Sequence, residues 1–152
     1  MEITIYSREA IEKIIDCDFP KNSVVISFYD TDLRYKNSDY KPVDYKGKAK
    51  ELFYIGALDI DIDILSDFNL TYDTYFTEAD KLAEFIFNAY KNGYDIICQC
   101  EYGQSRSAGC AAAIKEFFYH NGIDIFVDYR FYPNQLIYHK VYDALQKFAE
   151  KI

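Results

Sequence analysis

The most informative part of this chain is Ile96-Ile97-Cys98-Gln99-Cys100-Glu101-Tyr102-Gly103-Gln104-Ser105-Arg106-Ser107-Ala108-Gly109-Cys110. It opens with an apolar run that contains β-branched residues, crosses a turn at Gly103, and continues into the Ala-rich segment Ala111 to Phe118. These features predict a strand, a loop and a helix in succession. Backbone N–H groups where such a loop enters a helix converge on one point and are reinforced by the helix dipole. The stretch therefore predicts an anion-binding loop.

The composition of that loop favours a phosphate over other anions. Five residues separate Cys100 from Arg106, and Ser107 follows. A guanidinium can bind two phosphate oxygens at once in a planar geometry that Lys cannot copy, and Gly103 allows the backbone to turn without a Cβ in the way. The N–H groups that would bind phosphate would also stabilise a Cys100 thiolate, which makes this cysteine a candidate nucleophile. The predicted phosphate-binding residues are Glu101, Tyr102, Gly103, Gln104, Ser105 and Arg106.

The arrangement of Cys100, Arg106 and Ser107 resembles the Cys-x5-Arg-Ser/Thr signature of the protein tyrosine phosphatase superfamily, and most closely that of small dual-specificity-type enzymes. The resemblance is sharp from about Asp95 to Ile114 and weaker from Phe53 to Ala83. It implies a cysteinyl-phosphate intermediate and no cofactor. The family usually has His immediately before the nucleophile, whereas this chain has Gln99.

The leaving oxygen of a phosphotyrosine must be protonated as it departs, because the acid of a phenolate has a pKa of about 10. In the family that the loop resembles, one Asp does this from the segment after the strand beside the nucleophile strand. The resemblance favours Asp61 as this acid, with Asp67 second because its separation from Cys100 is more usual for the family. Asp59 and Asp63 are further candidates.

Ser107 is expected to place its hydroxyl near the sulfur of Cys100, to cap the following helix, or to do both. Cys98 is two residues before Cys100 on the same strand face, and we expect it to be a core thiol, as we do Cys110. A zinc site built from these three cysteines and His120 is disfavoured, because the long rigid segments between the ligands oppose tetrahedral closure. We predict no metal site.

Alternating strand and helix signals predict an α/β fold: a three-layer sandwich whose mostly parallel sheet of four to five strands has helices on both faces. Expected strands cover residues 2–6, 23–29, 52–58 and 94–100, with 123–127 as a candidate edge strand. Expected helices cover residues 8–15, 77–92, 106–122 and 135–151, with Ser7, Thr77 and Asn134 as N-caps. Residues 30–50 are expected to form an exposed connection, which is either a plain surface loop or part of a substrate rim.

Length and composition limit the function further. The 152 residues form a single expected domain, 1–152, without a linker, repeat, signal peptide or membrane span. Four cysteines are too few for a disulfide framework in a chain of this length, which favours a cytoplasmic protein. A net charge of −8 argues against nucleic acid or an anionic membrane as the partner.

These observations predict a cysteine-dependent phosphomonoesterase, a protein tyrosine or dual-specificity phosphatase acting on a phosphotyrosine-containing protein or a small phosphomonoester. Glu101 and the lack of Lys between Cys100 and Arg106 argue against polyphosphoinositides. One alternative is a pseudophosphatase that binds phosphate or phosphotyrosine with weak or no turnover. Gln99 in place of His and the choice among several acids both leave this alternative open. A sulfur-transfer or arsenate-reducing enzyme is a second alternative, disfavoured because those relatives carry the loop near the N-terminus.

Overall fold

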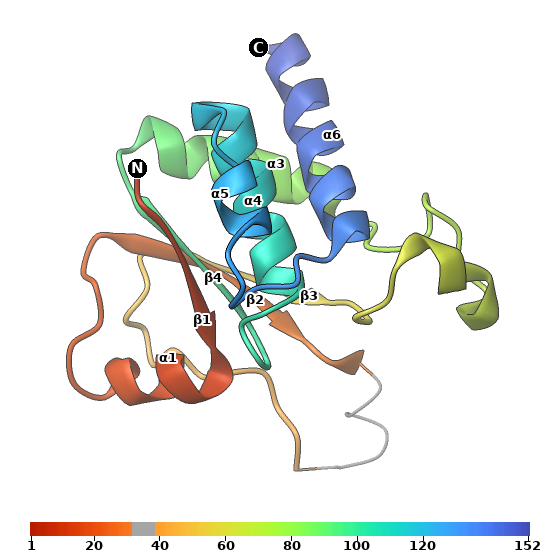
Figure 1. Ribbon diagram of the computed structural model, residues 1–152. Helices are drawn as coiled ribbons and strands as arrows, with labels where there is room; N and C mark the ends of the chain where they lie inside the picture. Colours follow the sequence, from red (N-terminus) through yellow and green to blue (C-terminus); the bar gives the residue numbers. More distant parts are fainter. Residues whose placement is uncertain (32–38) are drawn as a thin grey trace.

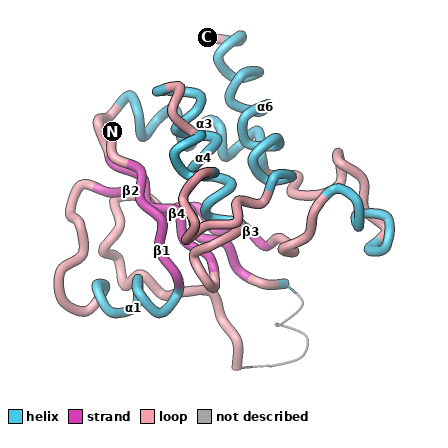
Figure 2. Tube along the Cα trace, in the orientation of Figure 1, coloured by secondary structure: helices cyan, strands magenta, loops and turns pink. Residues whose placement is uncertain are grey.

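The computed structural model describes residues 1–31 and 39–152 and contains a four-stranded parallel sheet in the order β1-β4-β2-β3. Figures 1 and 2 show the helices on either side of it. The strands are β1 (Ile3–Ser7), β2 (Ser23–Tyr29), β3 (Leu52–Gly56) and β4 (Asp95–Cys100). The helices are α1 (Arg8–Ile15), the 3-10 helix η1 (Ile62–Phe68), α3 (Ala79–Lys91), α4 (Arg106–Tyr119), α5 (Ile123–Phe126) and α6 (Gln135–Lys151). The predicted three-layer α/β class is confirmed.

Alternation along the strands separates two apolar layers, because successive side chains of a strand point to opposite faces. One layer lies beneath α3, α4 and α6 and includes Ile26, Cys98 and Cys100. The other, beneath α1, includes Val25 and Ile97. Both faces of the sheet are therefore covered, as buried parallel strands require.

β4 is an interior strand, with β1 on one side and β2 on the other. Its residues from Ile96 to Cys100 are all buried. Ser7 is the register partner of Cys100 across the β1–β4 pair, so α1 and the loop after β4 both begin at the same end of the sheet. The carboxyl ends of all four parallel strands meet at this end, where ligands of open α/β sheets bind.

Several predicted boundaries are wrong in detail. Ile123–Phe126 is the short helix α5 rather than an edge strand. Thr77 does not cap α3, whose N-cap residue is Glu78 and lacks a side-chain capping bond. α4 ends at Tyr119 with His120 in the left-handed conformation, before the predicted stop at Gly122. β3 ends at Gly56 instead of Leu58.

The connection between β2 and β3 is less exposed than predicted. Val43 and Tyr45 are both 2% exposed, and they pack with α1 against the lower face of the sheet. Residues 32–38 of this connection lie outside the described residues, so the prediction of an exposed loop remains a prediction there.

Candidate active site

The loop from Glu101 to Ser105 joins β4 to α4 and is held to the scaffold by its carbonyl groups. The Glu101 carbonyl accepts from the N–H of Arg8 at 3.0 Å, and the Gln104 carbonyl accepts from the N–H of Tyr132 at 2.8 Å. The Ser105 carbonyl accepts from the N–H of Asn134 at 3.0 Å. Because C=O and N–H point in opposite directions in a trans peptide, the N–H groups of the same three peptide units turn away from the scaffold. An anion-binding loop needs its N–H groups to point outward in this way, toward the ligand.

The backbone N–H groups of the loop residues have no partner among the described residues. Within residues 1–31 and 39–152, no hydrogen bond uses the backbone N–H of any residue from Glu101 to Ser105. Gly103 has a φ of +66°, and a Cβ on it would lie 2.6 Å from the backbone nitrogen of Ser7. Glycine is therefore required at this position for two reasons: the positive φ, and the close approach of the β1 backbone.

Cys100 lies beneath the loop, with its sulfur 3.0 Å from the hydroxyl oxygen of Ser107. Both residues are buried, at 2% and 0% exposure. The expected proximity of the two side chains is present, but Ser107 lies inside α4 and is not its N-cap. Ser105 holds the cap position and makes no side-chain capping bond.

The other buried thiols belong to the core. A hydrogen bond with Cys110, together with burial, raises the pKa of the Cys98 thiol well above its ordinary value. Cys98 is therefore kept protonated, as suits a packing residue beside α4 rather than a nucleophile. All four cysteines of the chain are free.

Arg106 is 3% exposed, and one arm of its guanidinium is fixed by the protein. Its Nη1 donates to Oδ1 of Asp30 at 2.5 Å and to the carbonyl of Ala57 at 2.9 Å. Burial alone would lower the pKa of Arg106, but the charges of Asp30, Cys100 and Asp59 reverse that effect and raise it. Its Nε is buried and has no partner among the described residues. A buried guanidinium donor without an acceptor costs free energy unless a ligand supplies one.

The segment after β3 meets the loop through Asp59. Oδ1 of Asp59 accepts from the hydroxyl of Ser105 at 2.7 Å and from the side-chain amide of Asn134 at 3.1 Å. Asn134 also donates to the carbonyl of Ile60 at 2.9 Å and accepts the N–H of Ile137 at 2.9 Å, which caps α6 as predicted. Asn134 therefore caps a helix and also links the loop to the segment after β3.

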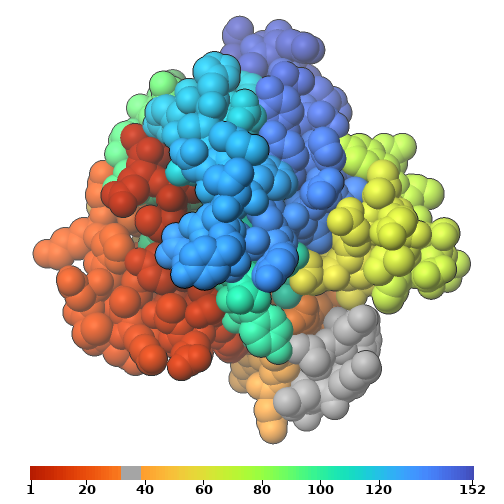
Figure 3. All heavy atoms as spheres, in the orientation of Figure 1, coloured from red at the N-terminus to blue at the C-terminus, as the bar shows by residue number. Residues whose placement is uncertain are grey.

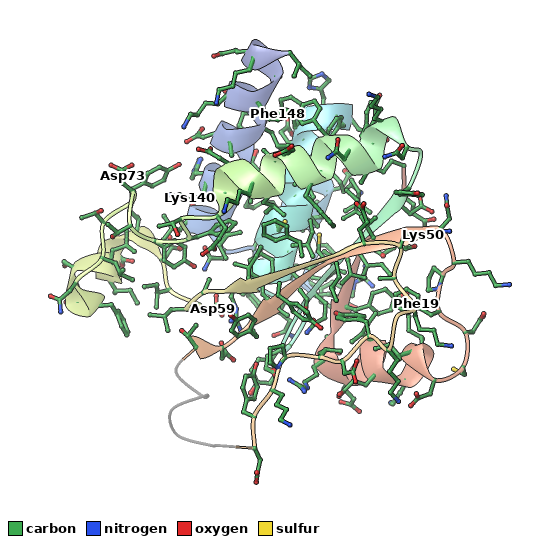
Figure 4. The ribbon with its side chains drawn as sticks, turned by 180° about the vertical axis from the view of Figure 1, so that it is seen from behind. Phe19, Lys50, Asp59, Asp73, Lys140 and Phe148 are labelled. Carbon is green, nitrogen blue, oxygen red and sulfur yellow. The ribbon has the colours of Figure 1, made fainter. Side chains whose placement is uncertain are left out.

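The four candidate acids occupy different positions in this segment, which begins beside the site at Asp59 (Figure 4). Asp59 is hydrogen-bonded to the loop, whereas Asp61 caps η1 by accepting the N–H of Ile62 at 2.8 Å. Burial raises the pKa of Tyr75, the charge of Arg106 lowers it, and the charges of Asp59 and Asp61 raise it further, so these three groups act together on the Tyr75 hydroxyl. Asp63 and Asp67 are exposed residues of η1 and take no part in this group.

Gln99 points to the opposite face of the sheet from Cys100 and forms a buried polar cluster. Its Oε1 accepts from the hydroxyl of Ser27 at 2.5 Å and from that of Tyr45 at 2.8 Å. The exposures of Gln99, Ser27 and Tyr45 are 1%, 1% and 2%. The position before Cys100 is therefore occupied by a neutral amide whose oxygen accepts two hydrogen bonds.

Two residues of this site could not be identified from the sequence. Asp30 gave no signal because it lies 76 positions from Arg106 in sequence and only the β2–β4 pairing brings it near. Tyr75 gave none either, although its hydroxyl donates to the carbonyl of Leu58 at 2.6 Å and supports the exit of β3.

Residues 1–31 and 39–152 contain neither a metal-ligand cluster nor a helix fit to span a membrane. In this part of the chain, no three or more His, Cys, Asp or Glu side chains are grouped so that they could hold a metal ion. None of its helices combines the length and apolar character needed to cross a bilayer.

Three solved structures resemble this chain in fold. The human tyrosine phosphatase-like serine/threonine/tyrosine-interacting protein matches with a TM-score of 0.50 at 14% identity, over 95% of this chain and 85% of that chain. PTPMT1 in complex with PI(5)P matches at 0.54 and 10% identity, over 99% and 94% of the two chains. Human DUSP28 matches at 0.53 and 12% identity, over 99% and 95%. No family model and no curated protein matches the sequence.

The chain therefore has the fold of the protein tyrosine phosphatase superfamily. Within that fold, the loop from Cys100 to Arg106 lies at the carboxyl end of an interior parallel strand, next to a buried guanidinium.

Proposed function

We propose that the protein is a cysteine-dependent phosphomonoesterase, with a protein tyrosine phosphatase or dual-specificity activity on phosphotyrosine-containing proteins or small phosphomonoesters. The observation that carries this proposal is a set of donors that have no acceptor within residues 1–31 and 39–152: the N–H groups of Glu101 to Ser105 and Nε of Arg106. A buried donor such as Nε of Arg106 is normally paired, and successive backbone N–H groups in one loop form an anion-binding concavity, so together they suit an anion with several oxygens.

In the proposed first step, the thiolate of Cys100 attacks phosphorus while Arg106 and the loop amides bind the non-bridging oxygens. A phosphorus–sulfur bond forms and the bond from phosphorus to the leaving oxygen breaks. The Asp61 carboxylic acid gives its proton to that oxygen. Asp61 is preferred to Asp59 because Asp59 already accepts two hydrogen bonds that anchor the loop.

In the proposed second step, the Asp61 carboxylate takes a proton from water, which attacks the cysteinyl-phosphate and releases inorganic phosphate. Ser107 then donates a hydrogen bond to the departing sulfur, for which its 3.0 Å separation is suited. No metal or cofactor has a role in this scheme.

A phosphotyrosine is favoured over a polyphosphoinositide. PTPMT1 was crystallised with PI(5)P, but the loop of this chain carries Glu101 and has no Lys between Cys100 and Arg106. A polyanionic headgroup would meet the Glu101 carboxylate, which already contacts the guanidinium of Arg8 at 3.4 Å, and no loop Lys. Because its four cysteines are free, we assign the protein to the reducing cytoplasm.

Hydrolysis of p-nitrophenyl phosphate tests the proposal. Turnover by the wild-type chain, abolished in Cys100→Ser and inhibited by vanadate, is the expected result. The second candidate is a pseudophosphatase, favoured by one observation: the neutral amide of Gln99 places no positive charge behind Cys100. Binding of phosphate or vanadate without turnover would support that alternative and overturn the first.

A further inference from the structure

The net charge of this protein is concentrated in one stretch. Between Lys50 and Lys81 the sequence has no Lys or Arg, and its eight carboxylates equal the net charge of the whole chain, −8. These carboxylates are Glu51, Asp59, Asp61, Asp63, Asp67, Asp73, Glu78 and Asp80. All but Glu51 follow β3, so the negative charge lies at the carboxyl end of the sheet, where the candidate active site is.

Residues 59–78, which we call the acidic arm, project from the body of the protein beyond β3 and the start of α6 (Figures 1 and 3). The arm is anchored where it leaves and where it rejoins the body. Asn134 donates to the carbonyl of Ile60 at 2.9 Å, and the ammonium of Lys140 donates to the carbonyl of Tyr72 at 2.7 Å. The Tyr72 hydroxyl donates to Asp143 at 2.6 Å. These bonds give the arm a defined position.

The arm presents apolar side chains to solvent in that position. Ile62, Leu65 and Phe68 are spaced by three residues, which aligns them along one face of the 3-10 helix η1. Leu65 is 5% exposed, but Ile62 and Phe68 are 62% and 43% exposed. The apolar line formed by these three side chains is therefore buried at Leu65 and exposed to solvent at Ile62 and Phe68.

A pocket of about 300 Å³ lies between the arm and α6, and Ile62 forms part of its wall. Its lining is completed by Asp61, Tyr72, Gln135, Leu136, His139 and Asp143. The pocket adjoins the candidate active site through Gln135, which follows Asn134, the residue that donates to Asp59 and to the Ser105 carbonyl. Its volume, at the lower end for ligand sites, suits one large side chain.

We infer that the acidic arm and this pocket bind a segment of a phosphoprotein substrate, with an apolar side chain in the pocket and Lys or Arg residues beside it. This inference rests on the proposed function and specifies its substrate class. Charge complementarity selects the occupant: among the described residues the pocket is lined by Asp61 and Asp143 and by no Lys or Arg, so an acidic segment would be repelled and a basic one attracted. Apolar contact supplies affinity, and charge supplies selectivity and a faster encounter.

Phosphotyrosine peptides with one common core test the inference. One series carries Leu or Phe at positions from four before to four after the phosphotyrosine, with Lys or Arg neighbours. A second series has Glu neighbours, and a third has Ala for the apolar residue. We expect kcat/KM for the best basic and apolar peptide to exceed its Glu and Ala counterparts by about tenfold at low salt. The advantage over the Glu peptide should shrink at high salt, because screening weakens exposed charge pairs.

Variants separate the surface from the chemistry. Phe68→Ser and Ile62→Ser should reduce the ratio of kcat/KM for the Leu peptide to kcat/KM for the Ala peptide. Because both values come from the same variant, a change in the chemical step affects them equally and leaves the ratio unchanged. Ile123→Ser is the matched control, since Ile123 is 60% exposed and lies on α5. Its ratio should equal that of the wild type.

Equal kcat/KM for all peptides, alongside turnover of p-nitrophenyl phosphate, would overturn the inference and leave the proposed function intact. If the chain hydrolysed no phosphate ester, the proposed function would be wrong instead. Binding of the same peptides to Cys100→Ser, measured by fluorescence anisotropy, would still test the surface. A dimer in sedimentation that Phe68→Ser dissociates would assign the apolar line to a second copy of the chain, and that result would also overturn the inference.

Discussion

Asp30, at the end of β2, fixes Arg106 through a 2.5 Å hydrogen bond from Nη1 to Oδ1. The contact is part-buried, with the Asp30 side chain 20% exposed and that of Arg106 4% exposed. The bond leaves Nε of Arg106 for another acceptor and sets the plane of the guanidinium. Asp30 is thus a positioning residue for the proposed phosphate site.

Replacing Asp30 with Ala should free the guanidinium to rotate. We expect kcat/KM for p-nitrophenyl phosphate to fall about 10- to 100-fold and vanadate inhibition to weaken in parallel, because a charge-assisted hydrogen bond contributes about 1.5–3 kcal/mol. Asp30→Asn keeps an acceptor and should recover part of the loss. Asp124→Ala, an exposed carboxylate on α5, serves as the control. Unchanged vanadate affinity in Asp30→Ala would contradict the assignment.

Ser107 should affect the second step more than the first. Its hydroxyl lies 3.0 Å from the sulfur of Cys100, where it can stabilise the thiolate as the phosphoenzyme breaks down. In Ser107→Ala we expect kcat to fall about tenfold and a burst of p-nitrophenol to appear in rapid mixing, since the intermediate accumulates. A fall in rate without a burst would place its effect on the attack of Cys100 instead.

Asp61 and Asp59 should behave differently when changed to Asn. Asp61→Asn removes a general acid, so phenyl phosphate hydrolysis should fall by about 10² or more, with a smaller loss for p-nitrophenyl phosphate, whose leaving group needs less protonation. Asp59→Asn instead loosens the bonds to Ser105 and Asn134 and should raise KM for both substrates. Asp67→Asn is the matched comparison on η1. A leaving-group effect in Asp67→Asn and not in Asp61→Asn would reverse the assignment.

Gln99 should matter for stability. Its Oε1 accepts from Ser27 and Tyr45, all three being buried, so Gln99→Leu leaves two hydroxyls without that acceptor. We expect the free energy of unfolding in urea to fall by about 2–6 kcal/mol, from about 1–3 kcal/mol for each of the two orphaned hydroxyls. The triple variant with Ser27→Ala and Tyr45→Phe should regain part of it. No recovery would show that packing, rather than hydrogen bonding, dominates.

Alkaline pH should destabilise the fold through Tyr45 and Tyr75. Burial raises the pKa of both hydroxyls above the ordinary value. Their contribution is fully present below the unfolded pKa of about 10 and is lost as pH rises further, because only the unfolded chain then releases the proton easily. Unfolding in urea between pH 8 and 11 should show a decline that is shallower in Tyr45→Phe, by up to about 1.4 kcal/mol per pH unit. Equal slopes would contradict the burial effect.

The sequence predicted the parts of this protein that depend on local pattern. Residues Cys98 to Ser107 combine an apolar strand, a glycine turn and a helix start within a few positions, and the strand–loop–helix unit follows from them. The run at Ile123 was misassigned because a short apolar segment fits a strand or a helix equally well without a longer period. Thr77 has the side chain of a favoured N-cap, but α3 begins too late for it to serve, after Glu78.

The parts that could not be predicted depend on contacts between distant segments. Asp30 meets Arg106, and Asp59 meets Ser105 and Asn134, only because β2, β3 and β4 end at the same edge of the sheet. A single sequence contains no signal for such pairs. The roles of Cys100, Arg106, Ser107, Asp61 and Asp67 stay predictions that the experiments above test.

Gly109 bears on how this site could diversify. A Cβ at that position would lie 2.4 Å from the carbonyl oxygen of Asn134, so α4 meets the residue that begins α6 at a spacing that only glycine permits. Tolerance to amino-acid substitution therefore differs between the two regions. The Gly109–Asn134 junction is confined to its present residues, whereas the outer side chains of η1 are free to vary. A lineage or a randomised library could alter what is recognised at the arm while keeping the helix junction that supports the loop.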